Sequence, residues 1–220
     1  MRLTLLNGSP KTGESASSIV LEIALEKLSG PDAVVQTAKA AVSEKDPASL
    51  PSFPLFPILE SDAILVSFPL YFDGPPSGLV RFLEKLAAEA REARGSARGT
   101  ATRLYGIVNC GFHETDRSNL ALETLKIFAA SAGFVYGRGL SLGGGPFISM
   151  TAKTFRRGGF PFGKQREAMD ALFESAGTLS KGPDLEGTVS LPRSLYNIGA
   201  NIHWKMLAKK EGNKTKDLYR

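Results

Sequence analysis

A short N-terminal stretch brings together the residue types that bind a phosphate group. Apolar residues 3–6 predict a buried strand, and the spacing of apolar residues in 17–28 predicts a helix. The turn between them, residues 8–18, is rich in Ser and Thr and carries Lys11. Backbone N–H groups and hydroxyls gathered at the positive end of a helix dipole bind phosphate. The stretch therefore predicts a phosphate site, with ordinary helix capping as the alternative.

This turn matches neither of two common nucleotide-binding patterns. It lacks the Gly-Lys-Ser/Thr ending of the Walker pattern and the Gly-x-Gly-x-x-Gly spacing of dinucleotide sites. Gly8 and Gly13 tolerate the positive φ angles that a tight turn needs. What remains is a hydroxyl-rich loop with a single lysine.

The elements that must position this loop follow an alternating order. The pattern of apolar residues predicts four further strands or strand starts and three further helices. The predicted strands are 33–37, 62–69, 104–109 and 134–136, and the predicted helices are 77–93, 118–132 and 164–179. Residues 38–60 hold several prolines and predict an irregular connection. This order favours a parallel sheet with helices on both faces.

Three loops with ligand-binding character each follow a predicted strand. They are residues 8–18, 70–77 and 110–114. Ligands of such sheets bind beyond the carboxyl ends of the strands, at the point where the strand order reverses. We therefore expect the three loops to meet at one edge, which favours the phosphate site over simple capping.

Composition and charge restrict the class of protein. The chain has 220 residues, of which 42% are hydrophobic, and its lone cysteine, Cys110, excludes an internal disulfide or a cysteine-based metal site. The net charge of +5 is concentrated in residues 193–220, which hold seven Lys or Arg and two acidic residues. The rest is neutral and shows no RNA-binding aromatic signature, so we expect no nucleic-acid partner. No signal peptide and no apolar run near ~20 residues is found, so we expect a cytoplasmic protein without a membrane span.

The three loops resemble those of the flavodoxin-like NAD(P)H-dependent FMN reductases. The stretches that carry the resemblance are Asn7-Gly8-Ser9-Pro10-Lys11 with Ser15-Ala16-Ser17, Ser67–Ser77 with its Pro-x-Tyr, Asn109–Glu114, and the tail with His203-Trp204-Lys205 and Lys216–Arg220. The chain departs from the family at Lys11, where arginine is frequent, and a lysine cannot form a bidentate fork. It also lacks the cysteine cluster of related iron–sulfur flavoproteins and the acidic character of true flavodoxins.

The resemblance implies a fold, a cofactor and an activity. The fold would be a flavodoxin-like, doubly wound, five-stranded parallel sheet with helices on both faces over residues 1–182. Residues 183–220 would be a basic extension that packs on the fold or on a second subunit of a homo-oligomer, such as a homodimer. Bound FMN would pass hydride from NADPH or NADH to a small acceptor such as a flavin or a quinone. The alternative is a non-catalytic FMN-binding carrier that passes electrons to a protein partner.

The resemblance also implies the residues of the cofactor site. Ser9, Lys11, Ser15 and Ser17 would hold the FMN phosphate, and the flavin ring would lie among Pro69, Leu70, Tyr71, Phe72, Asn109, Cys110, Gly111 and Phe112. Tyr71 and Phe72 could instead pack under their loop, and Cys110 is expected to be a small buried residue. The cofactor carries the reaction in such enzymes, so no catalytic side chain and no metal ligand is assigned.

One further segment carries charge without a clear motif. Residues 155–164 include Arg156 and Arg157, which could meet a phosphate of the nicotinamide nucleotide. The simpler interpretation is a solvated charged loop.

Overall fold

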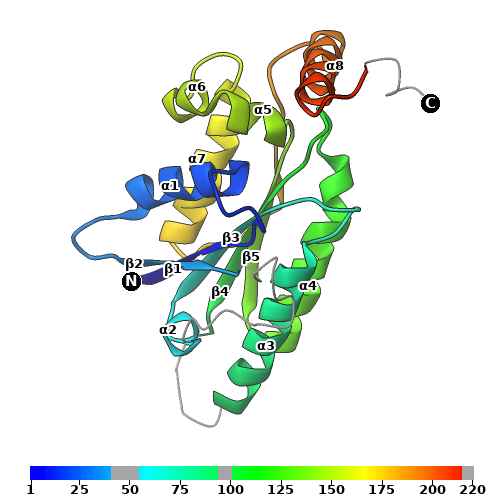
Figure 1. Cartoon of the computed structure of the whole chain (residues 1–220). Coiled ribbons are helices and arrows are strands. Elements are labelled where there is room, and N and C mark those ends of the chain that lie inside the picture. Colours follow the sequence, from blue (N-terminus) through cyan, green and yellow to red (C-terminus); the bar gives the residue numbers. More distant parts are fainter. Residues whose placement is uncertain (41–54, 94–100, 215–220) are drawn as a thin grey trace. The chain divides into compact units, whose positions relative to one another are not determined.

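The computed structural model describes residues 1–40, 55–93 and 101–214 (Figure 1). Its chain divides into two compact units, Met1–Val189 and Ser190–Arg220. Residues 183–189, expected in the C-terminal extension, therefore lie in the first unit. Most of the predicted irregular connection 38–60 and the motif Lys216–Arg220 fall outside the described residues.

The first unit contains a parallel sheet whose strand order is β2-β1-β3-β4-β5-β6. The strands are β1 (Arg2–Asn7), β2 (Val34–Lys39), β3 (Ala63–Pro69), β4 (Arg103–Asn109), β5 (Val135–Leu142) and β6 (Leu185–Gly187). All neighbouring strands pair in parallel. The central strands are buried on both faces, which explains their continuous apolar sequences.

The expectation of five strands is wrong, because the described residues form a six-stranded sheet. The additional strand, β6, has three residues with the sequence Leu-Glu-Gly, which is too short and polar to show a periodic pattern. Tertiary contacts fix it instead: Asp184 Oδ1 accepts hydrogen bonds from the Gly139 N–H at 2.6 Å and from the Tyr136 hydroxyl at 3.0 Å. The Asp184 carboxylate also lies 3.0 Å from Lys126 Nζ.

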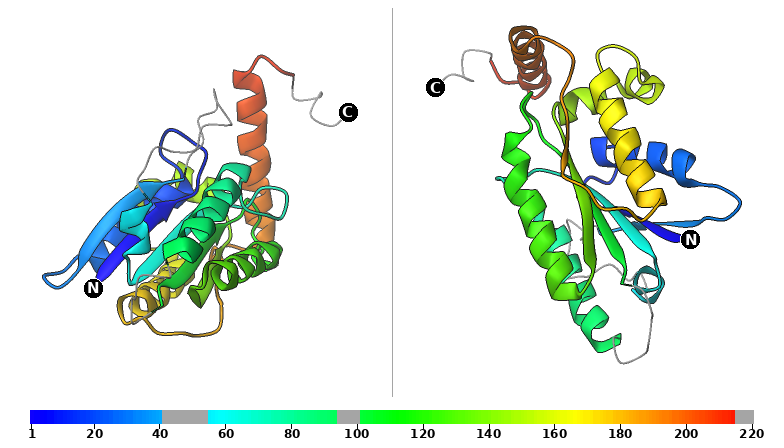
Figure 2. Two further views of the ribbon diagram at one scale, coloured as in Figure 1. Left: turned by 90° about the horizontal axis from the view of Figure 1, so that it is seen from below. Right: turned by 180° about the vertical axis from the view of Figure 1, so that it is seen from behind.

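Helices cover both faces of the sheet (Figures 1 and 2). On one face lie α1 (Ala16–Leu28), α5 (Gly145–Met150), α6 (Ala152–Arg157) and α7 (Gly163–Gly177), and on the other lie α3 (Ser77–Ala93) and α4 (Asn119–Ala132). Two apolar clusters, one under each helical layer, form the core. The α/β fold and the helices predicted at 17–28, 77–93, 118–132 and 164–179 are confirmed, each to within two residues.

Three short α-helices were not predicted. One is α2 (Phe56–Leu59), and the other two, α5 and α6, lie before the helix predicted at 164–179, where the sequence predicted no helix. Gly144 enters the left-handed region with φ of 72° before α5, and Gly158 does so with φ of 72° after α6. Phe155 and Phe162 pack edge to face with ring centroids 5.1 Å apart, which anchors α6 in the core. The loop interpretation of residues 155–164 is therefore wrong for its helical part.

The second unit is built on α8 (Arg193–Lys210). Leu195, Ile198, Ile202 and Met206 recur at helical spacing, and each is more than half exposed. None of the helices in the described part of the chain combines the length and apolar character needed to cross a membrane.

Candidate functional site

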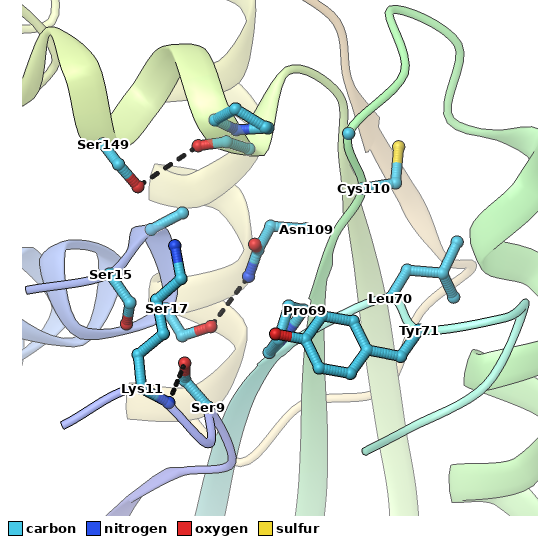
Figure 3. Close-up of a pocket in the computed structure, with 14 residues that line it drawn as sticks. Ser9, Lys11, Ser15, Ser17, Pro69, Leu70, Tyr71, Asn109, Cys110 and Ser149 are labelled. Atoms are coloured by element: carbon cyan, nitrogen blue, oxygen red, sulfur yellow. Dashed lines mark hydrogen bonds between the residues drawn. The ribbon is translucent and has the colours of Figure 1, made fainter. Parts of the chain in front are cut away.

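A cleft of about 190 Å³ opens at the carboxyl end of the sheet (Figure 3). It is built from the loops that follow β1, β3, β4 and β5. The lining residues are Ser9, Lys11, Ser15, Ala16, Ser17, Pro69, Leu70, Tyr71, Asn109, Cys110, Gly111, Gly145, Pro146 and Ser149. The chain leaves β1 for β2 on one side and later returns to β3 on the other, so the cleft lies at the topological switch point.

The N-terminus of α1 forms one wall of the cleft. Ser15 is the N-cap, and its Oγ accepts from the Ser18 N–H at 3.2 Å while the Ser15 N–H donates to Ser18 Oγ at 2.9 Å. The capping interpretation therefore holds for Ser15. The N–H groups of Ala16 and Ser17, which both line the cleft, have no partner in the described part of the chain. The helix thus presents two backbone donors at its positive end.

A buried amide ties this helix to the sheet. Asn109 is 5% exposed, and its Nδ2 donates to Ser17 Oγ at 2.8 Å and to the Phe68 carbonyl at 2.9 Å. The first bond, drawn in Figure 3, joins the end of β4 to α1, and the second joins it to β3. They use both amide protons of Asn109, while the hydroxyl proton of Ser17 has no acceptor among the described residues. Ser17 can therefore donate that proton to an anion in the cleft.

The loop after β1 is held close to the sheet. Ser9 is buried, its N–H donates to Asn7 Oδ1 at 2.9 Å, and its Oγ accepts from the Lys11 backbone N–H at 3.4 Å. Lys39 Nζ donates to the Lys11 carbonyl at 2.6 Å. Neither Gly8 nor Gly13 uses the positive φ that glycine tolerates. Gly8 is required for packing instead: a Cβ there would lie 2.6 Å from Leu79 Cδ2 and 2.9 Å from Phe68 Cβ.

The loop after β3 forms the apolar wall of the cleft. Pro69, Leu70 and Tyr71 line it opposite the hydroxyl-bearing residues (Figure 3). Tyr71 and Gly74 exchange backbone hydrogen bonds of 2.9 and 3.0 Å across a tight turn. The residues between them, Phe72 and Asp73, have φ of 48° and 61°, as in a type I′ turn. Phe72 stands fully in solvent at the tip of this turn and does not line the cleft.

The loops after β4 and β5 are joined by backbone hydrogen bonds. The Gly144 N–H donates to the Phe112 carbonyl and the Gly145 N–H to the Cys110 carbonyl, each at 2.7 Å. Cys110 is buried, its thiol donates to the Glu114 carbonyl at 3.0 Å, and burial raises the pKa of the thiol. These observations agree with the expectation that Cys110 is a small buried residue. Phe112 is 58% exposed and does not line the cleft.

Four lining residues were missed by the sequence analysis. They are Ala16, Gly145, Pro146 and Ser149. Three of them belong to α5, which follows β5 at the same sheet edge. The glycine run before Pro146 was the available signal, because proline in the first turn after glycine is typical of a helix start.

The lining of the cleft fits an anion joined to a flat ring. No carboxylate is among its lining residues, and Lys11 contributes a positive charge. Serine hydroxyls and unpartnered N–H groups cluster at one wall, while proline, leucine and tyrosine face them from the other (Figure 3). A phosphate would pair with the donors of the first wall, and an aromatic heterocycle would pack against the apolar side chains of the second.

No protein-family model and no curated protein matches the chain in sequence. Solved structures do match its fold. An NADPH-quinone reductase from P. pentosaceus matches with a TM-score of 0.50 and 14% identity over 80% of this chain and 97% of that chain. A protein described as flavone reductase matches with a TM-score of 0.51 and 10% identity over 83% of this chain and 66% of that chain.

These matches and the strand order define the fold class. The order β2-β1-β3-β4-β5 is that of flavodoxin-like proteins, with β6 added at one edge. The chain therefore has a flavodoxin-like fold, and its structural neighbours include reductases of the kind that the sequence resembles. The resemblance is confirmed at the level of the fold.

Proposed function

We propose that this protein binds FMN and is an NAD(P)H-dependent oxidoreductase that reduces a small acceptor such as a flavin or a quinone. The observation that carries the proposal is the cleft at the switch point, where hydroxyls and free N–H groups face an apolar wall and no carboxylate intrudes. The flavodoxin-like fold and the reductase neighbours support it. FMN, when bound, would supply the redox chemistry by accepting hydride from NADPH or NADH and passing electrons to the acceptor.

The phosphate of FMN would be held by the wall at α1. The N–H groups of Ala16 and Ser17 and the Ser17 hydroxyl have protons to donate, and Ser9 and Lys11 complete this wall. Ser15 would act mainly through its cap, which fixes the first turn of α1 in the orientation that exposes these donors.

The ring of FMN would lie against the apolar wall. Pro69, Leu70 and Tyr71 would contact it, and Gly111 would let the backbone approach it. A Cβ at Gly111 would meet only Pro146, at 3.9 Å, so packing within the chain does not require glycine at this position. Close approach to a ligand ring accounts for it better. The role of these residues is to orient the ring and exclude water.

Cofactor choice gives the first test. The cleft has donors for one terminal phosphate and its loop has no dinucleotide fingerprint, so the apoprotein is expected to bind FMN more tightly than FAD. Titration with each flavin, followed by quenching of flavin fluorescence, measures both affinities. Tighter binding of FAD would contradict the proposed site.

Reduction by a nicotinamide nucleotide gives the second measurement on the same protein. We expect NADPH or NADH to bleach the flavin absorbance of the FMN-loaded protein, and a quinone or free flavin to restore it. A bound flavin that neither nucleotide reduces would instead favour an electron carrier that acts on a protein partner.

The second unit is proposed to contact another copy of the chain in a homo-oligomer. Exposed apolar side chains at Leu195, Ile198, Ile202 and Met206 form a stripe along α8, and such stripes usually mark an interface. Replacing Ile198 and Ile202 by aspartate in the full chain is expected to lower the mass measured by light scattering. A matched control, Asn197→Asp with Asn201→Asp, places the same two aspartates at exposed positions on another face of α8 and should leave the mass unchanged. An unchanged mass for the aspartate variant, with loss of binding to anionic vesicles, would assign α8 to a membrane surface instead.

A further inference from the structure

An arginine from α6 bridges two carboxylates, one just before α1 and one on α1. Arg156 Nη2 lies 2.7 Å from Glu14 Oε2 and 2.6 Å from Glu22 Oε2. Glu14 immediately precedes the N-cap Ser15, and Glu22 lies on α1. The two carboxylates raise the pKa of Arg156. This arginine is therefore occupied by carboxylates at the α1 wall and does not line the cleft.

The position of Arg156 is fixed by the core on one side and by a polar contact on the other. The preceding residue, Phe155, is 2% exposed and packs in the same apolar cluster as Ile19 and Val20 of α1. The Arg156 carbonyl accepts a hydrogen bond from Arg166 Nη1 at 3.2 Å. Since α6 cannot rotate without disturbing this packing, the guanidinium is held next to the first turns of α1.

The two carboxylates would otherwise oppose an anion at the N-terminus of α1. Glu14 is next in the chain to Ser15, the N-cap of α1. Its charge therefore lies close enough to the N-terminus of α1 to act on an anion bound there, because charges interact over ~10 Å at 0.1 M salt. Helix N-termini attract anions through a partial positive charge, which a nearby carboxylate diminishes. A neutral glutamine or serine would avoid the conflict, yet the chain has glutamates at these positions and an arginine placed to balance them.

We propose that Arg156 is a positioning residue for the phosphate of the cofactor: it balances the charges of Glu14 and Glu22 and keeps the Glu14 carboxylate out of the cleft. This inference rests on the proposed binding of FMN. The proposed effect of Arg156 is electrostatic and is exerted at the α1 wall. Arg156 should therefore affect binding of the phosphate and not binding of the flavin ring.

The test compares FMN with riboflavin, which has the same ring and no phosphate. The Arg156→Ala variant is expected to bind FMN about five- to tenfold more weakly than the unaltered protein at low salt. Its affinity for riboflavin should not change. Neutralising the carboxylates in the same variant, as Arg156→Ala with Glu14→Gln and Glu22→Gln, should restore FMN affinity to within about twofold, since the uncompensated charges are then removed.

Arg157→Ala is the matched control. Arg157 follows Arg156 on the same helix, is exposed, and has no hydrogen bond or ion pair with any described residue. Its removal changes the net charge by the same amount and should leave FMN affinity unchanged. If Arg156→Ala proves too unstable to titrate, Glu14→Gln with Glu22→Gln in the presence of Arg156 serves instead and should tighten FMN binding.

The possible outcomes separate this inference from the proposed function. Unaltered protein that binds neither flavin would refute the FMN site itself. Unaltered protein that binds FMN, together with an Arg156→Ala variant of equal affinity, would overturn only the inference. Equal losses for FMN and riboflavin, or a loss that the glutamine substitutions do not reverse, would show that Arg156 merely packs α6 and would also overturn it.

Discussion

Replacing Asn109 by aspartate is expected to cause the largest loss of both stability and cofactor binding. The side chain is 5% exposed and donates to Ser17 Oγ at 2.8 Å and to the Phe68 carbonyl at 2.9 Å. Aspartate has the same shape but turns the donor into a charged acceptor facing a carbonyl that cannot donate. We expect a loss of about 2–4 kcal/mol in the free energy of unfolding, because a buried polar group is left unpaired and a charge is buried.

The same substitution should weaken FMN binding at least about hundredfold, because the new carboxylate lies behind Ser17 at the wall proposed to hold the phosphate. For a domain of this size the midpoint of thermal unfolding should fall by roughly 5–15 °C. Thermal melts and FMN titrations measure the two effects. Ser17→Ala, which removes one of the two acceptors of Asn109, is the milder comparison. An aspartate variant with the melting point and FMN affinity of the unaltered protein would show that the amide does not organise the cleft.

The strands and long helices were predictable because their patterns are local. Continuous apolar runs identify β3 and β4, and apolar spacing identifies α1, α3, α4 and α7. By contrast, β6 depends on Asp184, whose partners Gly139 and Tyr136 are distant in sequence. The helices α5 and α6 depend on Phe147 and Phe155, which pack with Phe162 in an apolar cluster that includes residues of α1. Such long-range contacts leave no periodic signal in the segment that they stabilise.

The location of the cleft was predictable, but the roles of several residues were not. Loops that follow parallel strands converge at one edge, so the loops 8–18, 70–77 and 110–114 were expected to meet there. The family resemblance supplied individual residues such as Tyr71 and Cys110. The sequence could not reveal that Asn109 donates both amide protons to groups of the same chain, because its partners lie on other elements. Nor could it separate Arg156 from Arg157, which differ only in the direction that α6 gives them.

The second large effect is expected at Gly137, which does not line the cleft. The register of β4 and β5 shifts between Leu104 and Tyr105, which pair with Tyr136 and Arg138, so that Gly137 is the extra residue of a bulge. A Cβ at Gly137 would lie 2.6 Å from Tyr105 Cζ and 2.8 Å from Cδ1. The Tyr105 ring is fully buried, and its hydroxyl donates to the carbonyls of Ser175 and Ser180 at 2.9 and 2.8 Å.

The Gly137→Ala variant is therefore expected to lose about 2–3 kcal/mol of stability, because the methyl group meets a ring that cannot withdraw without breaking its hydrogen bonds. Its melting point should fall by roughly 4–12 °C. FMN affinity should be retained once the protein is folded, since Gly137 and Tyr105 do not line the cleft. Gly30→Ala is the control, because a Cβ there meets no atom within 4 Å. Equal melting points for the two alanine variants would mean that the sheet relaxes around the bulge, and that the Tyr105 ring moves enough to accommodate the methyl group.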